Sequence, residues 1–139
     1  MDIGQMFMVG FDGRVVDKDH PVCRAVAEWG LGGVILFDRN VDGRVQNIRD
    51  PRQLRGLTRA LQACADGDLL IAVDQEGGRV CRLKPGDGFP AMAPAGELGT
   101  RDPAETARQA GRMAEVLADC GVNLNLAPVV DLDLNPGNP

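Results

Sequence analysis

Leu69–Gly88, LLIAVDQEGGRVCRLKPGDG, is the stretch of the 139-residue sequence that decides the fold. It opens with an unbroken apolar run over residues 69–73 and turns polar at Asp74. A short run that is apolar at every position is typical of a strand buried on both faces, as in a parallel sheet covered by helices. Such sheets bind ligands at the carboxyl ends of their strands, where this sequence carries carboxylates, glycines and arginines. A loop of solvated charges is an equally good interpretation of these residues.

Helix and strand patterns alternate on both sides of this stretch. Strand patterns cover residues 5–11, 33–37, 69–73 and 122–130. Helix patterns cover residues 21–29, residues from 50 to the stop at Gly67, and residues from 102 to about 120. Each helix pattern has proline in its first turn and closes on a glycine, where these residues are favoured. The order β-α-β-α-β-α-β predicts a parallel α/β fold, equivalent to about the first half of a (β/α)8 TIM-type barrel.

The helix patterns also predict caps and buried faces. We expect His20 to cap the first helix rather than to act as a catalyst, and Asp50 to cap the second with Gln53 reaching back. Helical spacing predicts these inner faces: Val22, Ala25, Val26 and Trp29; Leu54, Leu57, Leu61 and Cys64; Ala107, Ala110, Ala114 and Leu117. The connection from residue 75 to about residue 99 is predicted to be a long loop, and loops of that length are usually functional.

The composition is that of one globular domain, with 44% hydrophobic and 25% charged residues. A net charge of −5 argues against nucleic acid or an anionic membrane as partner, and no apolar run approaches the roughly 20 residues that span a bilayer. The N-terminus has no basic region typical of a secretory signal, which favours a cytoplasmic location. Arg52, Arg55 and Arg59 follow helical spacing, which indicates a solvated helix face rather than a phosphate site.

The sequence predicts neither a metal nor a cofactor. The four cysteines are scattered, which is a poor zinc pattern, and we expect Cys64 and Cys120 to be buried free thiols. Residues 30–33, GLGG, precede a strand, whereas a dinucleotide loop follows one. Residues 131–135 have the acidic spacing of a calcium loop, but Pro136 stands where that loop needs glycine.

The segment VDQEGGRV at residues 73–80, together with Arg82, resembles the signature of glycoside hydrolase family three. The likeness is greatest to the bacterial β-N-acetylglucosaminidases of cell-wall recycling. Residues 3–11, 32–37 and 121–131 are similar to the family's first, second and fourth strands. The resemblance therefore covers nearly the whole chain, with its motifs in the family's order.

The resemblance implies that residues 1–139 form the N-terminal half of a catalytic barrel domain. By the family's pattern, Asp74 hydrogen-bonds hydroxyls of a bound N-acetylglucosamine-containing saccharide, and Arg82 points into the same pocket. Glu76 and Arg79 match the motif as well, and we expect them to organise the loop as an ion pair. Cys81 stands where the family often has a polar residue.

The resemblance also implies where the chemistry lies. Retaining glycosidases need a nucleophile and an acid/base, which in this family are a late aspartate and a mid-barrel histidine paired with an aspartate. Neither motif occurs here, and the only histidine is His20. We therefore expect an inactive half-barrel that self-associates or is completed by a C-terminal half.

Three functions follow as hypotheses. The first is retaining hydrolysis of terminal β-linked N-acetylglucosamine from peptidoglycan fragments by the complete protein. The second is a non-catalytic sugar-binding or scaffold half-barrel. The third is another barrel enzyme: a family-three β-glucosidase type, or an unrelated one that binds a phosphorylated metabolite.

Overall fold

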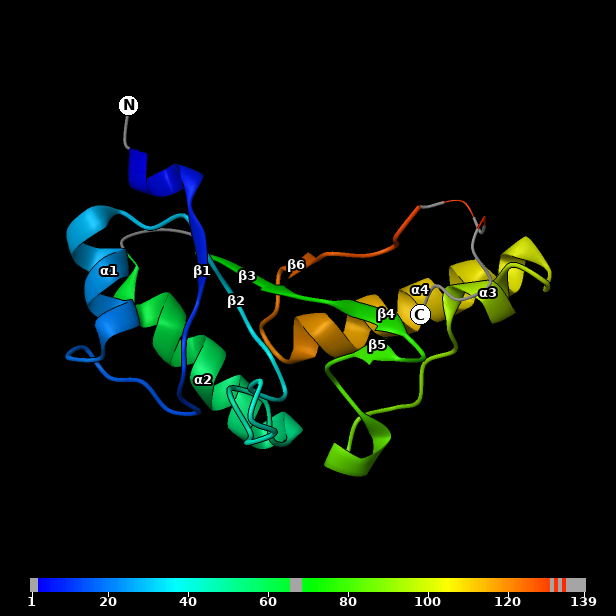
Figure 1. Ribbon diagram of the computed structural model, residues 1–139, viewed down its shortest axis with the longest axis horizontal. Coiled ribbons are helices and arrows are strands. Elements are labelled where there is room, and N and C mark those ends of the chain that lie inside the picture. The colour runs from blue at the N-terminus through cyan, green and yellow to red at the C-terminus, as the bar shows by residue number, and fades with distance from the viewer. Residues whose placement is uncertain (1–2, 66–68, 131, 133, 135–139) are drawn as a thin grey trace.

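A computed structural model describes residues 3–65, 69–130, 132 and 134 (Figure 1). The 3-10 helices are η1 (Ile3–Met6) and η2 (Pro85–Asp87). The α-helices are α1 (Pro21–Trp29), α2 (Pro51–Cys64), α3 (Ala95–Leu98) and α4 (Pro103–Asp119). The strands are β1 (Met8–Gly10), β2 (Gly33–Ile35), β3 (Leu70–Val73), β4 (Gln75–Gly77), β5 (Val80–Cys81) and β6 (Leu124–Asn125).

The main sheet of the described residues is parallel and has the order β1-β2-β3-β6. Val34 of β2 pairs with Val9 on one side and with Ile71 on the other. Figure 1 shows α1 and α2 beside the β1–β2 end of these strands and α4 beside β6, and the end of α4 joins the same core cluster as α2. The predicted α/β class and the predicted succession of parallel strands are confirmed, because each strand pairs with the next across a helical connection.

The core lies between the sheet and α2. Leu54 and Leu61 of α2 are fully buried against a cluster that includes Ile71 of β3 and Leu36, which follows β2. The predicted inner stripe of α2 is thus confirmed for its leucines. Burial of each such side chain contributes about 1.5–3 kcal/mol to folding, which makes this helix the main support of the sheet.

The predicted inner face of α4 is wrong over most of its length. Ala107, Ala110 and Ala114 are exposed, whereas Leu117 is buried. In α4 the contact with the core comes from the C-terminal part, through Met113, Val116 and Leu117. Just after the helix, Thr58 of α2 donates to the carbonyl oxygen of Cys120 at 2.8 Å. Trp29, also predicted to be inside, is 71% exposed: η1 contacts the backbone at the end of α1 and leaves this side chain uncovered.

The helix caps agree with the predictions. The His20 Nδ1 accepts from the backbone N–H of Val22, and the Asp50 carboxylate accepts from the backbone N–H of Gln53 at 2.8 Å. This N–H, followed by the Arg49 side chain, lowers the pKa of the Asp50 carboxyl from its usual value. The Gln53 side chain does reach back, but it accepts from Arg49 N–H, one residue before the cap.

The connection after β3 is more ordered than predicted. Instead of a single long loop, it forms the β4–β5 hairpin, η2 and the short α3. Gly77 has φ +92°, and a Cβ on it would lie 2.3 Å from the carbonyl oxygen of Ala93, so only glycine fits this close approach. The strand predicted over residues 122–130 shrinks to β6, while Asp131, Asp133 and Asn135 of the rejected calcium loop lie outside the described residues.

The expectation of a free thiol at Cys64 is wrong. Cys64 forms a disulfide with Cys23, with the two Cα atoms 5.3 Å apart, and this bond ties α1 to α2. The sequence could not indicate the pair because the two cysteines are 41 residues apart and meet only when the helices pack. Cys81 and Cys120 are free and buried, as expected for Cys120. In the described part of the chain, no helix is long and apolar enough to cross a membrane.

We predict that alkylation of the unfolded chain without reductant modifies Cys81 and Cys120 alone, and that reduction adds Cys23 and Cys64. In the folded protein Cys120 should react slowly at neutral pH, because burial raises the pKa of its thiol and keeps it protonated. Intact and peptide mass spectrometry after iodoacetamide treatment measures both. Alkylation of all four cysteines before reduction would contradict the disulfide.

Candidate functional site

The candidate site lies at the carboxyl ends of β2 and β3. Asp74 follows β3 directly, and Asp38 lies three residues after the end of β2. The β4–β5 hairpin then turns back (Figure 1). Arg82 and Lys84 thereby come to the same edge, where they contact Asp74 and Asp38. Neighbouring parallel strands deliver their carboxyl ends to one edge, which explains how residues distant in sequence gather here.

Asp74 and Arg82 are held together at this edge. The Arg82 Nη2 donates to the Asp74 Oδ2 at 2.7 Å, and the two side chains are 25% and 22% exposed. The Arg82 Cζ also lies 5.2 Å from the centroid of the Phe37 ring, within the range of a cation–π interaction. The structure therefore brings the two sequence-predicted residues into one partly open pair, and their role in sugar binding remains a prediction.

A second ion pair lies beside the first. The Lys84 Nζ donates to the Asp38 Oδ2 at 2.5 Å, and the other Asp38 oxygen is 3.7 Å from the Arg82 Nη1. The Asp38 side chain is 3% exposed, whereas that of Lys84 is 45% exposed. Sequence reasoning missed both residues, although one signal was present: Asp38 follows the strand pattern of β2 as Asp74 follows that of β3.

A buried glutamine holds the hairpin in this position. The Gln75 Oε1 accepts from the backbone N–H groups of Arg82 and Leu83, both at 2.9 Å. Its Nε2 donates to the Cys81 sulfur at 3.1 Å and to the Leu83 carbonyl at 3.3 Å. The Gln75 backbone N–H donates in turn to the Asn125 Oδ1 of β6 at 3.1 Å. One side chain thus fixes the backbone that carries Arg82.

Two expectations for the same loop need correction. Glu76 and Arg79 were expected to form an ion pair, but neither belongs to any ion pair among the residues that the structure describes. Arg79 is exposed in the turn between β4 and β5. Cys81 is buried under the loop, where its thiol contacts Gln75 and Leu83.

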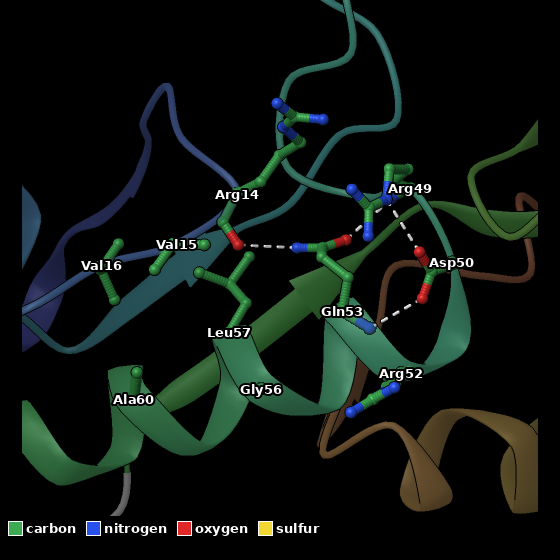
Figure 2. A pocket seen from close by; sticks show the side chains of 10 residues that line it. All are labelled: Arg14, Val15, Val16, Arg49, Asp50, Arg52, Gln53, Gly56, Leu57 and Ala60. Carbon is green, nitrogen blue, oxygen red and sulfur yellow. Dashed lines mark hydrogen bonds and ion pairs between the residues drawn. The ribbon is translucent and has the colours of Figure 1, made fainter.

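A separate cavity of about 560 Å³ lies between residues 14–16 and the first turns of α2 (Figure 2). Its polar lining includes Arg14, Arg49 and Arg52, and the Gln53 side chain donates to the Arg14 carbonyl at 2.8 Å. Arg49 is paired with Asp50, and Arg52 is exposed on α2 as the helical spacing predicted. The cavity shares no lining residue with the Asp74–Arg82 pair.

The chemistry of the Asp74–Arg82 pair suits a ligand rich in hydroxyl and carbonyl groups. Asp74 uses one oxygen to hold Arg82, which leaves the other to accept from a ligand hydroxyl. The guanidinium presents further N–H donors that can bind ligand oxygens. Partial burial strengthens such charge-assisted hydrogen bonds relative to bulk water.

The sequence matches the Glycosyl hydrolase family 3 N terminal domain over residues 1–139. The chain belongs to glycoside hydrolase family 3. The likeness stated from the sequence motifs is thereby confirmed, and with it the barrel-type α/β fold class.

Individual members of the family are similar to this chain. It is 44% identical over 133 residues to a protein named Beta-hexosaminidase from Bordetella pertussis. The matched residues make up 91% of this chain and 35% of that relative. A family 3 β-N-acetylglucosaminidase structure from Paenibacillus superposes with a TM-score of 0.86 at 33% identity, over 99% of this chain and 25% of that one. The chain thus spans about a third of the length of the curated relatives that it matches.

A further similar structure carries a ligand. It is the structure of NagZ from Neisseria gonorrhoeae in complex with N-trifluoroacetyl-D-glucosamine. It superposes on this chain with a TM-score of 0.70 at 31% identity, over 91% of this chain and 37% of that one.

We predict that Gln75→Leu destabilises the complete protein by on the order of 3 kcal/mol. The substitution keeps the side-chain volume but leaves the backbone N–H groups of Arg82 and Leu83 without their buried acceptor. Chemical unfolding followed by circular dichroism measures the change, with Gln46→Leu as a control because Gln46 makes a single side-chain hydrogen bond. Equal losses for the two variants would contradict the special role of Gln75.

Proposed function

We propose that the complete protein is a β-N-acetylhexosaminidase that removes terminal β-linked N-acetylglucosamine from peptidoglycan-derived fragments with retention of configuration. The observation that carries the proposal is the Asp74–Arg82 pair, partly open and at the carboxyl edge of a parallel sheet. The names of the similar family 3 proteins, and the acetylglucosamine analogue bound by one of them, support the same substrate class.

In this proposal Asp74 and Arg82 bind and orient the sugar and do not perform the chemical step. The free Asp74 oxygen accepts from a sugar hydroxyl, and Arg82 donates to a neighbouring oxygen. A retaining glycosidase needs a nucleophile and an acid/base about 5 Å apart. The family places those groups later in its barrel, and His20 is engaged as the cap of α1.

Residues 1–139 are proposed as the N-terminal half of the catalytic barrel domain. Leu70 and Leu126 are 46% and 43% exposed, although they come from β3 and from the residue after β6. The uncovered face of α4 borders a cavity of about 390 Å³ with an apolar lining that includes Leu98, Met113, Pro128 and Val129. A second half of the barrel would cover such surfaces.

We also propose a cytoplasmic location, as expected for recycling of cell-wall fragments. Disulfides persist mainly in oxidising compartments, so the Cys23–Cys64 bond makes this part of the proposal testable. Cell fractionation combined with thiol trapping in intact cells would report the compartment and the redox state together. Recovery with the secreted or periplasmic fraction would contradict the cytoplasmic location.

We predict that Asp74→Ala in the complete protein lowers kcat/KM for a chromogenic N-acetylglucosaminide by about 100-fold or more. The loss follows because the variant lacks the carboxylate that accepts from the sugar hydroxyl. The hydroxyl is then left without a hydrogen-bond partner in the bound state. Asp119→Ala is the control, since Asp119 is an exposed aspartate at the end of α4, and that end of the helix leads into the amino end of β6, away from the carboxyl edge of the sheet. Steady-state kinetics that are near normal for Asp74→Ala would refute the assignment of Asp74.

The same assay separates the alternative functions. Preferential turnover of a chromogenic β-glucoside would indicate a β-glucosidase-type enzyme. Sugar binding without turnover of either substrate by the complete protein would indicate a binding module.

We predict that residues 1–139 expressed alone turn over no N-acetylglucosaminide and do not behave as a well-packed monomer. In the described part of the sheet, β1 and β6 each have a strand on one side only, and open edges of this kind favour association. Size-exclusion chromatography with light scattering, run beside the chromogenic assay, tests both statements. A monodisperse, cooperatively unfolding monomer would contradict the packing statement, and turnover that follows the purified chain would contradict the chemical one.

A further inference from the structure

Asp38 is a carboxylate at the edge of the site that contacts two cations from another loop. We propose that Asp38 is a positioning residue: it holds the Arg82 guanidinium in the orientation that binds the sugar, and Lys84 balances the charge of the same carboxylate. The inference deepens the proposed function and rests on it, because it assigns Arg82 to the sugar pocket.

The burial of Asp38 shows why it needs these cations. Its side chain is 3% exposed, and a buried carboxylate without compensation carries a large desolvation cost. Lys84 supplies a hydrogen bond at 2.5 Å, and the Arg82 Nη1 lies 3.7 Å from the other oxygen. Asp38 follows β2, whereas both cations follow β3, so this carboxylate fixes the hairpin loop to the end of the neighbouring strand.

Arg82 is constrained from three directions. Asp74 binds its Nη2, Asp38 faces its Nη1, and the Phe37 ring lies beneath its Cζ at 5.2 Å. The Nε is buried and has no hydrogen-bond partner in the described part of the chain, so contacts at the two terminal nitrogens set the orientation of the group. Asp74 alone would leave the guanidinium free to pivot about the Nη2 contact. Asp38 removes that freedom.

The charges of the cluster balance. Asp38 and Asp74 carry two negative charges, and Arg82 and Lys84 carry two positive ones. Neutralising Asp38 leaves a guanidinium and an ammonium side by side, with Asp74 as the one carboxylate that remains in the cluster as the described residues form it. Repulsion between these like charges would then displace Arg82 from the geometry that meets the sugar.

The kinetic consequence is a change in binding rather than in chemistry. Arg82 contacts the non-reacting part of the sugar in this proposal, so misplacing it weakens the ground state and the transition state alike. Such a loss raises KM and leaves kcat nearly unchanged. A defect of folding alone would lower the amount of active enzyme and leave KM constant.

The test compares variants of the complete protein on a chromogenic N-acetylglucosaminide. Asp38→Asn should raise KM about tenfold with kcat within about twofold of the parent. In the Arg82→Met background, Asp38→Asn should add less than about twofold, since the residue on which it acts is gone. Lys84→Met alone should raise KM less than about threefold, because Arg82 keeps both carboxylates. Arg79→Met, at an exposed arginine of the same loop, serves as the control.

Specific outcomes would overturn the proposal. A KM for Asp38→Asn equal to that of the parent would do so. So would an equal fold increase in KM when Asp38→Asn is introduced into the Arg82→Met variant. An equal effect of Lys84→Met would show that Asp38 acts through Lys84. If Asp38→Asn does not fold, the double variant Asp38→Asn with Lys84→Met is used instead, because it removes the buried charge and its cation together. The double variant should fold and still raise KM. A KM equal to that of the parent would overturn the proposal.

A second readout separates this proposal from the proposed function. The Nε–H signal of Arg82 in a ¹⁵N NMR spectrum, assigned by its loss in Arg82→Met, reports the fixed guanidinium without any substrate. It should be sharp in the parent and broadened in Asp38→Asn, and an unchanged signal would overturn the positioning role. Absence of turnover by the parent together with a broadened signal would refute the proposed function alone.

Discussion

The candidate site depends on the hydrogen bonds of one buried group, the side-chain carboxamide of Gln75. Both of its ends are used: the oxygen binds two consecutive backbone N–H groups and the nitrogen binds a carbonyl and a thiol. The residues after β3 are charged and glycine-rich and have little apolar surface of their own to hold them against the sheet. The Gln75 side chain binds the backbone after β5 and so holds the two strands of the hairpin together. This places Arg82 next to Asp74 at the end of β3. The geometry of the edge is therefore set by a neutral, buried side chain.

Much of the architecture follows from local signals in the sequence. The apolar run before Asp74 predicts a strand covered on both faces, and Ile71 to Val73 are indeed completely buried. The Asp50-Pro51 start of α2 has a direct physical cause, because the aspartate binds a free N–H of the first turn and proline lacks one. Such signals involve residues a few positions apart, so the sequence alone is enough to find them.

What escaped prediction depends on contacts between distant residues. Cys23 meets Cys64, and Asp38 meets Lys84 across 46 positions, only because packed helices and paired strands bring them together. The alanines of α4 failed for a related reason: helical spacing identifies an apolar face, but it does not identify the element that covers it. Asp74 and Arg82 were found from a motif, and their mutual pairing came from the hairpin geometry.

The disulfide between α1 and α2 changes what happens when the backbone is cut. Cys23 and Cys64 close a covalent ring of the intervening chain, which contains β2 and the exposed connection around Val41. A protease that cleaves within this connection would separate the chain into two pieces that stay joined through sulfur. The ring also restricts the unfolded chain, a contribution of about 4 kcal/mol for a loop of this size in the chain-entropy account. The half of the sheet that carries Asp38 thus remains tethered to the half that carries Asp74 even after its connecting peptide is broken.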